Sequence, residues 1–309
     1  GCLRPGRSPV TAALALGTYR LRDVATAVRY AGASETTWLD TAPNYLHGRA
    51  QTLLAPVLVE HPRLQVATKV GFLTPQTREA VSAAGVLPPG MRHSLHPRYV
   101  RWQVKRNRHE LGRDRVETVF LHNPERVGEA SLRQVLKDAF SVLEQEAAAG
   151  HLVSYGVATW TGFHDRLFTV AGLDRLATEA AGSPQHHLKA IQLPVSLVMD
   201  SALAAALDGH GPITDAAARG WDVHASAPLH GGELLALATA ELAALLHSSL
   251  SIAQACLLAV ASCPGVSKVL LSASTPAHWD AARTALDEPP LPAETLRKVL
   301  DVLAPHHPD

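Results

Sequence analysis

Short runs of β-forming residues alternate along the chain with longer stretches in which apolar residues recur every three or four positions. Eight runs are predicted strands, each followed by a helical pattern: 13–17, 36–40, 64–69, 116–121, 152–157, 188–193, 221–225 and 267–271. Strands separated by helices pair in parallel through right-handed crossovers. Eight such repeats predict an α/β fold, a closed (β/α)8 TIM barrel, in preference to an open sheet.

The helical stretches and the connections have signals of their own. Apolar residues recur at i, i+3, i+4 and i+7 from Val24 to Ala31, directly after Asp23, a candidate N-cap. Another helix is predicted over 98–111. The longest irregular stretch, about 71–96 after the third strand, predicts a long loop that acts as a lid or a binding loop. No linker interrupts the pattern, so we expect 1–309 to form a single domain.

The balance of charges narrows the class of partner. With 28 Lys and Arg against 28 Asp and Glu, the formal net charge is zero, which argues against nucleic acid or an anionic membrane as the main partner. Three cysteines, at 2, 256 and 263, form no disulfide framework and indicate a reducing compartment. No apolar run approaches the roughly 20 residues that span a bilayer. We therefore expect a cytoplasmic protein, monomeric or weakly homo-oligomeric, that acts on a small molecule.

Side chains that transfer protons follow three neighbouring predicted strands. Asp40 ends the second strand and Tyr45 follows it, Lys69 ends the third, and His122 ends the fourth. The carboxyl ends of barrel strands meet at one rim, so these four side chains should converge there. A tyrosine has a pKa of about 10, which a nearby ammonium lowers. Asp40 would keep the lysine charged, and His122 would orient a substrate oxygen.

The chain resembles the aldo-keto reductase superfamily over nearly its whole length. The matching stretches, in the order and spacing of that family, are Leu39-Asp-Thr-Ala-Pro-Asn-Tyr45, Ala67-Thr-Lys-Val70, Phe120-Leu-His-Asn-Pro-Glu125, Tyr155-Gly-Val157, Ile191-Gln192 and Ala227-Pro-Leu229. The resemblance implies that Asp40, Tyr45, Lys69 and His122 are the catalytic tetrad. Tyr45 would donate the proton, and a reduced nicotinamide would deliver hydride to the carbonyl carbon.

The same resemblance implies a cofactor site along the later strands. Thr159 and Gln192 would contact the nicotinamide carboxamide, and Ser226 stands where many relatives have a stacking tyrosine. The pyrophosphate would lie on a glycine-containing loop, because glycine lets backbone amides approach phosphate. The expected residues of that loop are Leu229, Gly231 and Gly232.

The adenosine phosphates would lie at a helix N-terminus, which favours anions, beside Ser272, Ser274 and His278. Thr275 stands where relatives specific for the 2′-phosphate often have Lys or Arg, and His278 or Arg283 could compensate. The resemblance implies NADPH as the cofactor, by the habit of the family, while the residues themselves leave NADH open.

The substrate pocket should include Tyr19, His47 and Trp160, which suggest aromatic walls with one or two polar anchors. No metal site is expected. The closest histidine pairs lack the Cys, Asp or Glu spacing of a metal site and are interpreted as surface residues; these pairs are His93 with His96, His186 with His187, and His306 with His307.

The leading hypothesis is an NAD(P)H-dependent enzyme of a biosynthetic or small-molecule pathway that reduces an aldehyde or ketone, or catalyses the reverse oxidation of the alcohol, by hydride transfer. An alternative is a barrel that binds the cofactor with little turnover, as a sensor or structural partner. The altered carboxamide and stacking positions motivate it. A third hypothesis, cofactor-free lyase or isomerase chemistry, would require that the later loops bind no dinucleotide.

Overall fold

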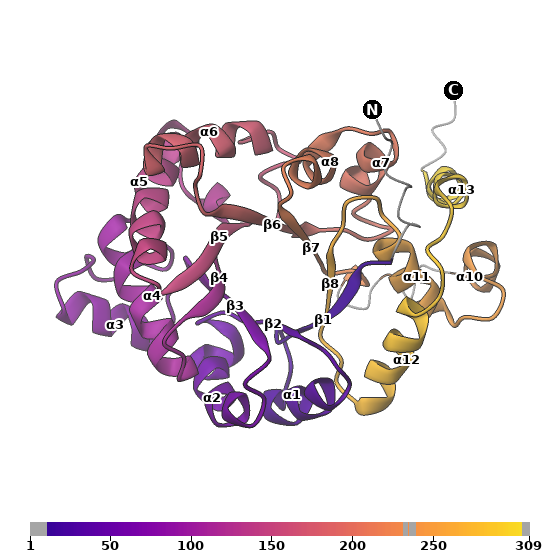
Figure 1. Cartoon of the computed structure of the whole chain (residues 1–309), viewed down its shortest axis with the longest axis horizontal. Helices are drawn as coiled ribbons and strands as arrows, with labels where there is room; N and C mark the ends of the chain where they lie inside the picture. The colour runs from indigo at the N-terminus through magenta and orange to yellow at the C-terminus, as the bar shows by residue number, and fades with distance from the viewer. Residues whose placement is uncertain (1–10, 231–233, 235–238, 305–309) are drawn as a thin grey trace, which may run out of the picture.

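The computed structural model describes residues 11–230, 234 and 239–304, and within them eight parallel strands close into a barrel (Figure 1). The strands are β1 (Ala13–Gly17), β2 (Trp38–Asp40), β3 (Gln65–Val70), β4 (Val116–His122), β5 (Leu152–Ala158), β6 (Leu188–Pro194), β7 (Asp222–Ser226) and β8 (Lys268–Leu271). They pair in sequence order, and β8 closes the barrel on β1. The predicted fold class is confirmed; the largest error in a strand boundary is at β2, predicted from 36 and observed from 38.

Helices surround the barrel on its outside (Figure 1). They are α1 (Val24–Ala33), α2 (Ala50–Glu60), α3 (Pro75–Ala83), α4 (Pro97–Leu111), α5 (Glu129–Ala148), α6 (Val170–Ala181), α7 (Ser201–Leu207), α8 (Gly211–Ala218), α10 (Ala240–Leu246), α11 (Ile252–Ala261), α12 (Pro276–Leu286) and α13 (Ala293–Leu303), with short 3-10 turns η1 (Tyr45–Gly48) and η2 (Pro124–Arg126). The predicted cap of α1 is confirmed, because Asp23 accepts a hydrogen bond from the Thr26 amide at 3.0 Å. No helix in these described ranges is long and apolar enough to cross a membrane.

The long connection after β3 is more ordered than the sequence suggested. Residues Pro75–Ala83 within it form helix α3, which begins at the Thr74 N-cap. Pro75 occupies the first turn, where proline is well tolerated because its missing N–H would have no helical partner. Beyond the helix, Phe72 forms a β-bridge with His93. The stretch 71–96 therefore closes back on the end of β3, beside the rim where the site residues lie.

The centre of the barrel is largely apolar. Seven buried residues pack there as one cluster: Ala15, Trp38, Ala67, Phe120, Ala158, Ala190 and Leu270. His224 of β7 meets the Trp38 and Phe120 rings edge-on, at centroid distances of 5.4 and 5.3 Å. It is fully buried, and neither ring nitrogen has a hydrogen-bond partner in the described part of the protein. Burial, and then the charges of Lys268 and Lys69, hold the pKa of His224 well below its usual 6.5.

Replacing this histidine should make the protein less sensitive to acid. Because the native pKa lies below the unfolded value of about 6.5, the unfolded chain binds a proton that the native state does not, and stability falls as the pH drops below about 6.5. We expect His224→Leu to remove up to about 1.4 kcal/mol of this loss per pH unit. Urea unfolding at pH 7.5 and 5.5 measures it, with the exposed His210→Gln as control. An unchanged difference between the two pH values in His224→Leu would contradict the interpretation.

Candidate functional site

Three of the expected catalytic side chains end adjacent strands at the same rim of the barrel. Asp40 is the last residue of β2, Lys69 lies next to the end of β3, and His122 ends β4. The strand register sets them side by side, since Asp40 pairs with Ala67 and Lys69 with Phe120. Side chains along a strand alternate between the two faces of the sheet, and these three residues occupy positions that face the inside. All three side chains therefore point into the barrel mouth.

Asp40 and Lys69 form a buried ion pair. The Lys69 ammonium lies 2.6 Å from Asp40 Oδ1 and donates to the Thr41 carbonyl at 2.8 Å. Their side chains are 4% and 1% exposed. Gln192 donates from Nε2 to the other carboxylate oxygen of Asp40 at 2.8 Å. Burial alone would lower the pKa of Lys69, but the Asp40 carboxylate and the Tyr45 hydroxyl together outweigh it and raise that pKa above its ordinary value of 10.5, so the lysine is charged.

Tyr45 reaches the rim from a strained turn. Leu46 and His47 directly after it adopt left-handed backbone conformations, with φ of 51° and 54°, which cost free energy for residues with a Cβ and are typical of functional sites. The Tyr45 ring is buried, and the Lys69 ammonium lies 4.8 Å from its centre. Burial raises the pKa of the phenol, while Lys69 opposes the rise. Lys69 lowers the pKa of the phenol in the predicted direction, but burial outweighs the ammonium and the net shift is upward.

His122 lies edge-on to the Tyr45 ring, with the ring centres 6.3 Å apart. Burial, followed by the charges of Lys69 and His93, holds the pKa of His122 well below 6.5, so the imidazole is neutral. Its Nδ1 atom is buried and has no partner among the described residues. Its backbone carbonyl is fixed by His93 Nε2 at 2.7 Å. A neutral imidazole with an uncommitted nitrogen can hydrogen-bond the oxygen of a bound ligand.

Other polar residues fix the backbone that carries these groups. Thr18 donates from both its amide and its hydroxyl to the Asp40 carbonyl, at 3.0 and 2.9 Å. Asn107, fully buried on α4, donates to the Lys69 carbonyl at 2.8 Å. Neither Asn107 nor His93 is recognisable from the sequence as a residue of this site. A buried asparagine inside a helical pattern carries no signal of its own, since only the tertiary contact explains it.

The predicted carboxamide contacts are already engaged in the protein. Thr159 donates its hydroxyl to the carboxylate of Glu125, which also accepts from the Trp160 and Thr161 amides at 3.2 and 3.4 Å. The Gln192 amide nitrogen is engaged by Asp40. Glu125 was part of the recognised sequence pattern but was assigned no function. The structure makes it the residue that holds the loop after β5.

The remaining cofactor candidates lie around the ends of β7 and β8. Ser226 ends β7 and Leu229 follows it, both partly buried, while Gly231 and Gly232 lie outside the described residues. Ser272, Ser274 and His278 are exposed at the start of α12, which Thr275 caps by accepting from the His278 amide at 3.1 Å. Arg283, proposed as a compensating cation, lies 3.6 Å from Asp280 of the same helix.

The three proposed substrate-binding residues differ in their exposure and in their contacts at the barrel mouth. Tyr19, 53% exposed, stacks at a tilt on Tyr45 with the ring centres 5.3 Å apart. Trp160, 44% exposed, follows the loop held by Glu125. His47 is exposed in the strained turn after Tyr45. Tyr19 is therefore the candidate in direct contact with the group expected to donate the proton.

The histidine pairs predicted to lie on the surface differ in burial and in their contacts. His186 is buried and lies 2.5 Å from Asp174, and His93 contacts the His122 backbone, so the prediction of surface residues is wrong for both. His306 and His307 lie outside the described residues. Across the described ranges, no three His, Cys, Asp or Glu side chains gather in a way that could hold a metal ion.

Comparisons with known proteins agree with this geometry. A family model described as "Aldo/keto reductase family" matches residues 11–303. No curated protein matches the sequence significantly. Among solved structures, glycerol dehydrogenase from Gluconobacter oxydans is similar at 18% identity and a TM-score of 0.71, covering 97% of this chain and 93% of that one. A Pseudomonas aeruginosa protein classed as an aldo-keto reductase is similar at 20% identity and a TM-score of 0.61, covering 93% and 92%. These structural likenesses support the barrel fold.

Proposed function

Because this chain belongs to the aldo/keto reductase family, whose members are oxidoreductases of carbonyl compounds, we propose that it reduces an aldehyde or ketone with a nicotinamide cofactor, or oxidises the corresponding alcohol. The observation that carries the proposal is the position of the Tyr45 ring, 4.8 Å from a charged Lys69 that Asp40 holds at 2.6 Å, with His122 edge-on beside it. Few other chemistries need a phenol, an ammonium and a neutral imidazole close together at one rim of a barrel.

The residues at the rim fit a dinucleotide. The start of α12 presents exposed hydroxyls at a helix N-terminus, where amides and the helix dipole favour phosphate. Ser272 and Ser274 would contact that phosphate. Because its amide nitrogen is bound to Asp40, Gln192 would meet the carboxamide through its amide oxygen. Reduced nicotinamide, when bound, supplies the hydride.

The chain's own groups would manage the proton. Burial keeps the Tyr45 phenol protonated at neutral pH, and it would give up its proton when the carbonyl oxygen becomes an alkoxide, a far stronger base. The Lys69 ammonium would stabilise the phenolate left behind, and Asp40 keeps that ammonium charged and in place. His122, neutral and with Nδ1 uncommitted, would orient the carbonyl oxygen.

A fluorescence titration with NADPH and separately with NADH tests the proposal. The protein has five tryptophans, and Trp160 lies exposed beside the rim, so we expect quenching by NADPH and consumption of NADPH when an aldehyde panel is added. Trp160→Phe should remove much of the quenching without abolishing turnover. Binding of neither nucleotide would refute the reductase proposal. Equal binding of both would mean that the 2′-phosphate is not recognised and would favour NADH use.

A second proposal is a cofactor-binding sensor with little turnover. The observations in its favour are that Glu125 already engages Thr159 and that Ser226 offers no aromatic face for stacking. Tight nucleotide binding with no consumption of NADPH across the carbonyl panel would support it. We further propose a single barrel domain in a reducing, cytoplasmic setting, since Cys256 and Cys263 are both free and buried.

A further inference from the structure

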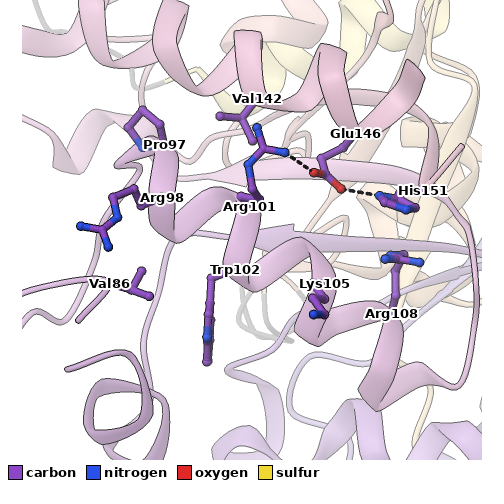
Figure 2. Close-up of a pocket in the computed structure, with 10 residues that line it drawn as sticks. All are labelled: Val86, Pro97, Arg98, Arg101, Trp102, Lys105, Arg108, Val142, Glu146 and His151. Carbon is purple, nitrogen blue, oxygen red and sulfur yellow. Dashed lines mark hydrogen bonds and ion pairs between the residues drawn. The ribbon is translucent and has the colours of Figure 1, made fainter. Parts of the chain in front are cut away.

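A groove on the outside of the protein lies between α4 and α5 (Figure 2). It has a volume of 540 Å³, within the roughly 300–1,000 Å³ typical of small-molecule sites. Its walls combine apolar side chains, among them Val86, Pro97 and Val142, with a row of cations. None of the residues considered for carbonyl reduction borders it, so it needs a separate explanation.

The cations come from one face of α4. Arg98, Arg101, Lys105 and Arg108 follow one another at spacings of three, four and three residues, which place them in a row along the helix. Arg98 and Lys105 are exposed, and neither side chain has a hydrogen-bond or ion-pair partner in the described part of the chain. Figure 2 shows the row from Arg98 at one end of the groove to Arg108 at the other.

On the α5 side of the groove, one buried carboxylate contacts both an arginine and a histidine. Glu146 of α5 is 5% exposed and accepts from Arg101 at 2.8 Å, while its other oxygen lies 2.6 Å from His151 Nδ1 (Figure 2). Its charge is therefore taken up by Arg101. Arg108 is anchored by a 2.6 Å hydrogen bond to the Asp114 carbonyl, which carries no net charge, and its Nε atom is buried without a partner in the described residues. Three positive charges, on Arg98, Lys105 and Arg108, remain uncompensated.

Trp102 gives the groove an aromatic surface beside these charges. Tyr99 stacks on it with ring centres 6.3 Å apart, and the Arg106 guanidinium lies 5.2 Å from its ring centre. These two contacts pack against the indole, and Trp102 also lines the groove. Uncompensated guanidinium groups beside an indole suit phosphate attached to an apolar or aromatic body.

We propose that the α4–α5 groove binds a small organic phosphate whose body is flat or apolar. Lys105 and Arg108, one helical turn apart, would bind the phosphate, Arg98 would add positive charge at the other end of the groove, and Trp102 with Val142 would bind the body. A small molecule is favoured over a polymer because the cavity is of small-molecule size and because the formal net charge of the chain is zero, which gives no long-range attraction for nucleic acid.

Calorimetric titration with 1-naphthyl phosphate tests the site, with inorganic phosphate and 1-naphthol as probes of its two halves. We expect the ester to bind more tightly than either half. Arg98→Gln with Lys105→Gln should weaken the ester by about tenfold or more, whereas Trp102→Leu should weaken the ester and leave inorganic phosphate unchanged. The exposed Arg63→Gln is the matched control, and urea unfolding checks that each variant is folded.

Three results would overturn the proposal. The first is no binding of the ester at low salt. The second is binding that the Arg98→Gln/Lys105→Gln variant leaves unchanged, which would place the probe at another site. The third is an oligouridylate or an oligoglutamate peptide that binds more tightly than the ester and loses affinity in the same variant, which would make the occupant a macromolecule. NADPH consumption in the charge variants should match the unaltered protein, so the groove and the barrel mouth are tested separately.

Discussion

Replacing Tyr45 with phenylalanine is expected to lower kcat for carbonyl reduction by about 10²–10⁴-fold, the usual contribution of a positioned proton donor. The substitution removes one oxygen atom and keeps the ring between Tyr19 and Lys69. The Asp40–Lys69 pair loses the side-chain hydrogen bond between Lys69 and Tyr45 but keeps those to Thr41 and Gln192, so it stays in place. Nucleotide binding should therefore persist while NADPH consumption falls, as fluorescence titration and steady-state kinetics measure.

The matched control is Tyr19→Phe, which removes the same hydroxyl group from the neighbouring ring. Tyr19 stacks on Tyr45 but is 53% exposed, so Tyr19→Phe should leave kcat within a few-fold and act mainly on KM. Comparable losses in both variants would mean that the pair of rings shapes the pocket and that neither phenol donates the proton. Full activity in Tyr45→Phe would mean that another group donates the proton, with His122 a candidate.

The convergence of the site was predictable because it depends on topology. Once β2, β3 and β4 are predicted as neighbouring parallel strands, Asp40, Lys69 and His122 must meet at one rim. The strand pattern also predicted the closed barrel, since buried runs and helical stripes alternate with little ambiguity. These are properties of the order of residues along the chain, and no side-chain partner is needed to infer them.

The hydrogen-bond partners of the side chains within the site were not predictable from the sequence. Gln192 bonds Asp40 across 152 positions of sequence, and Thr159 bonds Glu125 across 34, so their availability to a cofactor depends on contacts that spacing does not encode. The direction of the Tyr45 pKa shift depends on burial outweighing a charge, and burial depth is a tertiary property. His224 shows the same limit, because a histidine inside the barrel cannot be told by its sequence from one on the surface.

The second large effect concerns stability. Lys69→Met should lower the free energy of unfolding by about 3–5 kcal/mol, the cost of leaving a buried charge without its partner. Methionine nearly matches the lysine in length, so little cavity forms. The Asp40 carboxylate, 4% exposed, would keep the hydrogen bond from Gln192 but lose the ammonium at 2.6 Å. Urea unfolding measures the loss, and the exposed Lys105→Met should change stability by well under about 1 kcal/mol.

A second replacement separates charge burial from lost packing. Asp40→Asn, added to Lys69→Met, removes the unpaired charge and keeps an oxygen for Gln192, so the double variant should be more stable than Lys69→Met alone although it carries two changes. If the stability losses caused by Lys69→Met and by Asp40→Asn simply add in the double variant, the two residues are not coupled through their charges. Neither variant should recover turnover, because the proposed role of the ammonium beside Tyr45 needs its positive charge in place. Stability restored without activity would show that Lys69 serves folding through Asp40 and proton transfer through Tyr45.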